Sequence, residues 1–190
     1  MALSAVALSS RALLKLGAAS IAGFGEGTAE SEVAGQLYPP LRDALLSAHP
    51  WNFATGQARL ARLAAVPLAD FAYAYQLPAD FLRALSAGSG LRGRGLEYRI
   101  AERRLHCDAE EVLLTYIFRP QEADFPAFFD HTLIARLAAE FCLPLTESTS
   151  RAEMLSRLAE REFILAKQID AQQDMAPRIE DFALIEARNS

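Results

Sequence analysis

The sequence has few cysteines, a shortage of positive charge and no long hydrophobic run, and each shortage limits what the protein can be. Its two cysteines, Cys107 and Cys142, lack the close spacing of zinc sites and redox-active pairs, so we expect reduced, buried thiols. The net charge of −5 disfavours a protein that grips nucleic acid by its phosphates, because such proteins are usually basic. The apolar stretches are too short or too often interrupted by charge to span a bilayer, so we expect no membrane partner.

Recognisable catalytic and cofactor motifs are also missing. The glycines between residues 23 and 27 follow a predicted helix rather than a strand, which argues against a dinucleotide-binding loop. His106, Cys107 and Asp108 are adjacent in a predicted strand, so their side chains would alternate between opposite faces and could not converge on one metal ion. We therefore predict no catalytic residue, no cofactor and no metal, and we do not expect an enzyme.

Helical periodicity dominates both ends of the chain. Hydrophobic residues make up 52% of the sequence, which is enough for a sizeable core. Their spacing predicts helices over about residues 2–16, 28–48, 126–143 and 149–173. Thr28 can cap the second of these, and Ser148 or Ser150 the fourth. The prolines at 39 and 40 should kink or restart the second helix, and Pro144 should end the third.

The last predicted helix and the residues after it are more apolar than a surface segment requires. The helix has one row of large apolar residues, interrupted by Glu162, which we expect to form its packing face: Leu155, Leu158, Leu165 and Ile169. Residues 175–190 carry a second apolar set: Ile179, Phe182, Leu184 and Ile185. An arm that docks on a neighbouring chain would explain this second set.

Strand periodicity marks the middle of the chain. Alternation over residues 71–77 and 96–105 predicts a strand and a hairpin, and the apolar run 112–118 predicts a buried strand. The glycine-rich stretch 86–95 should be a loop. The sequence therefore predicts an α+β fold: a mainly helical core, in which N-terminal and C-terminal helices pack together, with a small antiparallel β-meander inserted over about residues 54–118. Residues 1–174 would form one domain, and residues 175–190 an extended C-terminal arm.

Two groups of residues stand out as candidate sites. The only tryptophan lies in a rigid corner after the second predicted helix, Pro50-Trp51-Asn52-Phe53, which we interpret as a structural joint with Trp51 and Phe53 filling the seam between helices and strands. Five arginines gather between residues 92 and 104, where they could face phosphates or carboxylates, form a salt-dependent protein contact, or simply be a solvated hairpin face. The candidate partner-binding residues are Arg92, Arg94, Arg103, Arg104, Ile179, Phe182 and Ile185.

Two phrases carry a resemblance to a known family. Residues 37–46, Leu-Tyr-Pro-Pro-Leu-Arg-Asp-Ala-Leu-Leu, run into His-Pro-Trp-Asn-Phe-Ala at 49–54, and Tyr-Ala-Tyr-Gln-Leu-Pro follows at 73–78. They resemble the signatures of the head–tail adaptor proteins of short-tailed bacteriophages, also called tail tubular protein A or gatekeeper proteins, with relatives in gene transfer agents. The similarity covers roughly residues 3–172. Pro39 departs from it, because an acidic or polar residue is expected there.

The resemblance implies a structural role. Members of this family are helical with a β-region, and they form a dodecameric ring beneath the portal that extends the DNA channel and offers a platform to the next tail component. The implied partners are the portal protein, the tail nozzle or next tail component, and neighbouring adaptor subunits, with genomic DNA passing through the lumen without sequence-specific binding. The implied location is the head–tail junction of a virion. A muralytic tail enzyme and a small DNA-binding regulator remain as alternatives.

Overall fold

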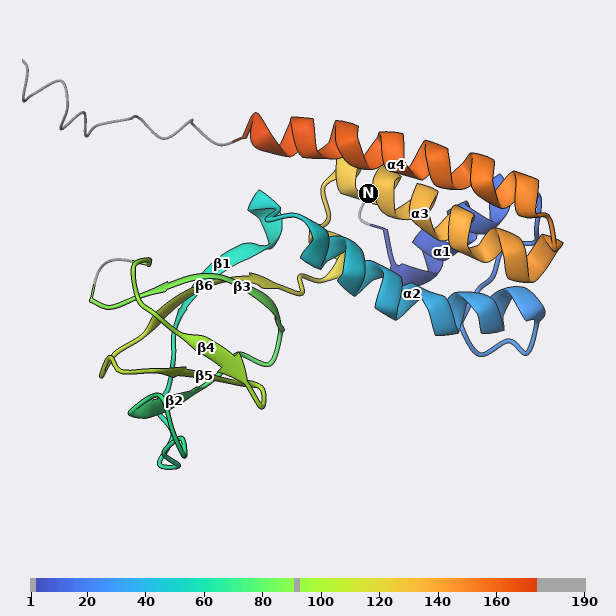
Figure 1. The fold of residues 1–190 in the computed structure, drawn as a ribbon. Helices are drawn as coiled ribbons and strands as arrows, with labels where there is room; N and C mark the ends of the chain where they lie inside the picture. Colours follow the sequence, from blue (N-terminus) through green and yellow to red (C-terminus); the bar gives the residue numbers. More distant parts are fainter. Residues whose placement is uncertain (1–2, 91–92, 174–190) are drawn as a thin grey trace, which may run out of the picture.

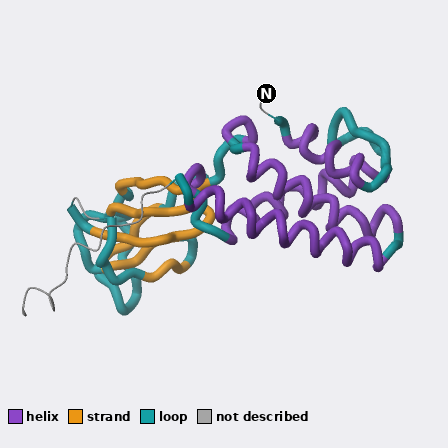
Figure 2. Tube along the Cα trace, turned by 90° about the horizontal axis from the view of Figure 1, so that it is seen from above, coloured by secondary structure: helices purple, strands orange, loops and turns teal. Residues whose placement is uncertain are grey.

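The computed structural model describes residues 3–90 and 93–173, which form a helical body and a β-body side by side. The helices lie together in one bundle, and the strands gather at one end of it (Figures 1 and 2). The described part contains α1 (Ala5–Lys15), α2 (Ala29–Ala48), α3 (Ala127–Thr146) and α4 (Thr149–Ala171). The four predicted helices are therefore confirmed, with ends within a few residues of the prediction.

The helices begin where the sequence offers side-chain caps. The Ser4 hydroxyl accepts a hydrogen bond from the Ala7 amide at the start of α1, and Ser148 accepts one from Arg151 at the start of α4. At α2 the Thr28 side chain accepts from the Ser31 amide while the Ser31 hydroxyl accepts from the Thr28 amide. Each cap satisfies amides that the first helical turn leaves without partners.

Prolines interrupt the helices less than predicted. α2 continues through Pro39 and Pro40 without a restart. Burial of Tyr38 and Leu45 on either side anchors the helix to the core, and this packing outweighs the backbone hydrogen bonds that the prolines remove. α3 likewise runs past Pro144 to Thr146, because a proline in the last turn removes only one hydrogen bond. The helix then ends at Glu147, whose backbone is left-handed (φ 54°).

The strands form two small antiparallel sheets. The strands are β1 (Thr55–Arg59), β2 (Tyr73–Gln76), β3 (Phe81–Gly88), β4 (Arg99–Ala101), β5 (Arg104–Cys107) and β6 (Leu113–Phe118). One sheet has the order β1-β6-β3 and the other β2-β5-β4. The α+β class is confirmed, but the connections differ from a simple meander, since only β4 and β5 are neighbours both in the chain and in a sheet. The loop predicted at 86–95 also begins later, because β3 extends through Gly88 along β6.

Two hydrophobic clusters hold the molecule together. The larger lies among the helices, and the smaller lies between the two sheets. Ile117 of β6 belongs to the helical cluster, and Leu82 and Leu85 of β3 pack against it, so one sheet is seated on the bundle. Cys107 and Cys142 are buried free thiols, as predicted. No helix within residues 3–90 and 93–173 combines the length and apolarity needed to cross a membrane.

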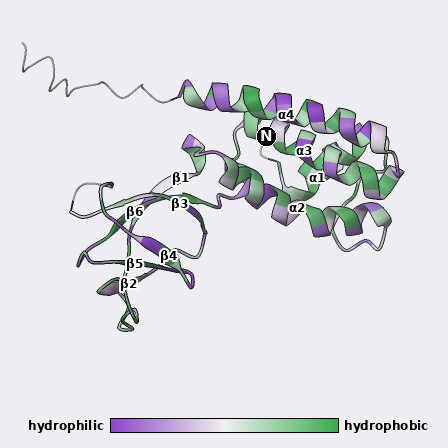
Figure 3. Ribbon diagram, in the orientation of Figure 1, coloured by the Kyte–Doolittle hydropathy of each residue, from purple (hydrophilic) through white to green (hydrophobic). Residues whose placement is uncertain are grey.

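The packing face of α4 was predicted wrongly. Of the four large apolar residues expected there, only Leu155 is buried; the rest of the buried face consists of Ala159, Ala166 and Asp170. Small residues occupy most of this face because they let α4 pack close against α3. The other three predicted residues, together with Met154, form an outward row: Met154 (53% exposed), Leu158 (45%), Leu165 (51%) and Ile169 (45%). Hydrophobic and hydrophilic residues accordingly alternate along α4 in Figure 3.

Candidate functional site

Trp51 lies where the chain passes from α2 to β1, and it belongs to the helical cluster. Its side chain is 0% exposed, and its indole N–H donates to the Leu45 carbonyl at 3.0 Å. Its ring meets those of Phe129 and Phe163 edge to face, with centroids 5.3 and 5.9 Å apart. Phe53, half-buried, adds a further edge contact with Phe129 at 4.9 Å. Trp51 and Phe53 therefore pack into the helical cluster, and the ring contacts described here are made with α3 and α4.

Asp170 fastens the joint to the last turn of α4. The Asn52 amide donates to both carboxylate oxygens of Asp170, at 3.2 and 3.1 Å, and the Asn52 side-chain amide donates to the Asp170 carbonyl at 2.8 Å. His49 Nε2 lies 3.6 Å from the same carboxylate. Burial raises the pKa of Asp170 above its usual range, although the Asn52 amide and His49 both oppose the shift. A carboxylate that is 1% exposed is thus committed to holding residue 52 in place.

An ionic network stabilises the second connection between the helices and the strands, the segment between the end of β6 and the start of α3. Arg119 donates to both oxygens of Asp43 at 2.9 and 2.6 Å. Arg42 donates to Asp43 at 3.0 Å and to Glu122 at 2.8 Å, and the Tyr38 hydroxyl also donates to Glu122 at 3.2 Å. Burial opposes ionisation of both carboxyls. The pKa of Asp43 is nonetheless lowered, because Arg119 and Arg42 donate hydrogen bonds to it. The pKa of Glu122 is lowered by hydrogen bonds from its own backbone amide, Arg42 and Tyr38.

The lowered pKa values of Asp43 and Glu122 predict acid sensitivity of this connection. A carboxyl with a depressed folded pKa stabilises the fold above its ordinary pKa, and that stabilisation is lost as the pH falls through the folded value. We expect each half-exposed carboxylate to contribute about 1 kcal/mol at neutral pH. Chemical unfolding of the wild type and of the Asp43→Asn/Glu122→Gln variant, from pH 7 to pH 3, should show a shrinking gap between them. A gap that is constant with pH would contradict the assignment.

The remaining predicted site residues lie elsewhere. Pro50 and Asn52 are exposed at the surface of the joint. Arg94 is exposed in the connection between β3 and β4. Arg103 is exposed in the two-residue turn between β4 and β5, where its backbone is left-handed (φ 58°). Arg104 lies 3.8 Å from Glu102. Arg92, Ile179, Phe182 and Ile185 lie outside the described residues.

Sequence reasoning missed the carboxylates that fasten the joint. Asp170 and Glu122 are far along the chain from the residues they hold, and no local pattern marks them. The only hint of the ionic network in the sequence was the adjacent pair Arg42-Asp43 within residues 37–46. In the part of the chain that the structure describes, no three His, Cys, Asp or Glu side chains converge where they could hold a metal ion.

Neither models of known protein families nor curated proteins match this sequence.

Proposed function

We propose that this protein is a structural virion component, a head–tail adaptor whose copies form a ring between the portal and the tail. The observation that carries the proposal is the outward row on α4, formed by Met154, Leu158, Leu165 and Ile169. A row of half-exposed large apolar residues on one side of a helix, although Glu162 interrupts it here, is typical of a surface that another protein covers. In the proposed ring, neighbouring subunits cover it.

The doubly pinned joint supports the same role. Trp51 and Asp170 hold one connection between the bodies, and the Arg42 network holds the other. Because both connections are fastened to helices, the β-body keeps one orientation relative to the bundle. An adaptor needs this rigidity, since it transmits shape between two assemblies and performs no chemistry.

The proposal includes the partners that the family resemblance implies. The bundle and the C-terminal arm would contact the portal protein and neighbouring subunits of a dodecameric ring, and the β-body would contact the tail nozzle or next tail component. Genomic DNA would pass through the lumen without sequence-specific binding. The net charge of −5 suits such a lumen, because carboxylates repel phosphates. The particle would be a short-tailed phage or a gene transfer agent.

Charging the α4 row is expected to abolish ring formation. The variant Leu158→Glu/Leu165→Glu would bury two unpaired charges at the subunit contact, so we expect association to weaken about 100-fold or more. Sedimentation velocity and negative-stain images, with and without purified portal protein, would measure this.

Ile164→Glu provides the matched control for the charged row. Ile164 is 44% exposed on the same helix but projects from another side, so this variant should assemble normally. A Leu158→Glu/Leu165→Glu protein that still forms rings on the portal would overturn the assignment of the row.

A further inference from the structure

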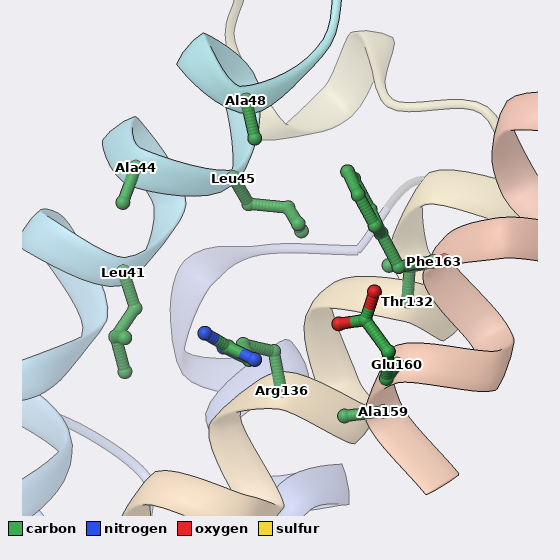
Figure 4. A pocket seen from close by; sticks show the side chains of 9 residues that line it. All are labelled: Leu41, Ala44, Leu45, Ala48, Thr132, Arg136, Ala159, Glu160 and Phe163. Atoms are coloured by element: carbon green, nitrogen blue, oxygen red, sulfur yellow. The ribbon is translucent and has the colours of Figure 1, made fainter. Parts of the chain in front are cut away.

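An open groove lies between α2 and α4, with α3 as its floor. It encloses about 140 Å³, and Figure 4 shows the two helices standing apart across it. Alanines line much of its walls, Ala44 and Ala48 on α2 and Ala159 on α4, and their methyl groups are too short to close the gap. Leu41 and Phe163 complete an apolar lining. The groove therefore has the size and chemistry to accept one or two large apolar side chains.

Charged side chains of both signs border the groove. The Arg136 side chain projects into it from the α3 floor (Figure 4), with its Nε 3.7 Å from Glu140. Lys167 Nζ lies 4.7 Å from the ring centroid of Phe163, on the α4 wall. Glu160 is the acidic residue in the lining. The apolar hollow suits an occupant with large apolar side chains, and Arg136 and Lys167 could pair with carboxylates next to them.

The C-terminal sequence of this same chain has that composition. Ile179, Phe182 and Ile185 recur every three residues, a spacing that places them along one side of a helix. Carboxylates alternate with them at Glu180, Asp181 and Glu186. We propose that the groove receives residues 179–185 of a neighbouring copy of this chain, an inference that rests on the proposed ring and specifies one of its contacts.

The direction of α4 points to a neighbour rather than to the same chain. Asp170 is fastened to Asn52, so the last turn of α4 is held in place. α4 continues for eight residues beyond Phe163 to Ala171, about 12 Å along its axis, so the described chain ends past its own groove. Each subunit offers one arm and one groove. Such a head-to-tail contact repeats identically around a closed ring and leaves no arm or groove unused.

Disulfide trapping in the full-length protein tests this contact. We would replace Ala48 and Phe182 with cysteine in the same chain; the native thiols Cys107 and Cys142 are buried and should not compete. Oxidation of ring-forming samples should produce a ladder of covalent oligomers on non-reducing gels, and neither single variant should produce it. A covalent link confined to single chains would overturn the assignment to a neighbour.

A filled groove provides the second test, and it separates this contact from ring formation itself. Ala44→Trp places bulk in the hollow at an exposed position, so the fold should survive, and the yield of trapped oligomer should fall about ten-fold in the Ala48→Cys/Phe182→Cys background. Gln36→Trp, exposed on α2 outside the groove, should leave it unchanged. If rings form in sedimentation but no covalent oligomer is trapped, the groove contact is wrong and the proposed ring is unaffected. The absence of rings on the portal would overturn the proposed function as well.

Discussion

Replacing Trp51 with alanine is expected to lower the free energy of unfolding by about 3–5 kcal/mol, the range for removing a large aromatic side chain from a core. The side chain is completely buried, and its neighbours Phe129 and Phe163 are anchored in α3 and α4, so they cannot move far to fill the space. The variant also leaves the Leu45 carbonyl without the indole donor. This places the expected loss in the upper part of the range.

Far-ultraviolet circular dichroism during urea unfolding would measure this loss. Tryptophan fluorescence cannot report on the variant, because Trp51 is the only tryptophan. Trp51→Phe keeps an aromatic ring but removes the donor, so it should fall between wild type and Trp51→Ala. Leu68→Ala, at a fully exposed position, should change stability by no more than about 0.5 kcal/mol. A loss below about 1 kcal/mol for Trp51→Ala would mean that the joint does not depend on this side chain.

Local features of the sequence account for the parts of the fold that were predicted well. The caps at Thr28 and Ser148 act on amides within the same turn, so their positions could be read from the sequence. Trp51 could be assigned to a buried joint because a large aromatic residue beside a proline has few alternatives to burial. The strand from Leu113 to Phe118 was recognisable because both of its faces are apolar.

The features that escaped prediction depend on partners distant in the chain. Asn52 and Asp170 are separated by 118 residues, and Arg119 and Asp43 by 76, so neither pair leaves a trace in any local window. β1 carries no clear alternation, because its register depends on pairing with β6. The α4 error has a similar origin. Periodicity identified a row of large apolar residues, but the tight fit to α3 selected alanines for burial and left the larger residues outside.

Replacing Asp170 with alanine is expected to lower the free energy of unfolding by about 1–3 kcal/mol, because the Asn52 amide loses its acceptor in a part-buried position. Asp170→Asn keeps one acceptor oxygen at the same place and should lose less. Calorimetry and denaturant titration would measure both variants. In the proposed ring, Asp170→Ala should also weaken assembly at temperatures where the variant is still folded, because the Asp170 contact holds the last turn of α4.

The pH dependence of the Asp170 contribution can be worked out from its raised pKa. A carboxyl whose folded pKa lies above its unfolded value stabilises the fold fully below the unfolded pKa, and part of that stabilisation is lost as the pH rises through the folded value. His49 acts in a separate window: burial lowers its pKa, so its contribution is present above the ordinary histidine value and is lost as the pH falls through the folded one. The difference in stability between wild type and Asp170→Ala should therefore be largest below the ordinary pKa of aspartate and decrease as the pH rises and Asp170 ionises. A difference that instead grows from pH 4 to pH 7 would show that the ionised carboxylate, rather than burial, dominates the contact.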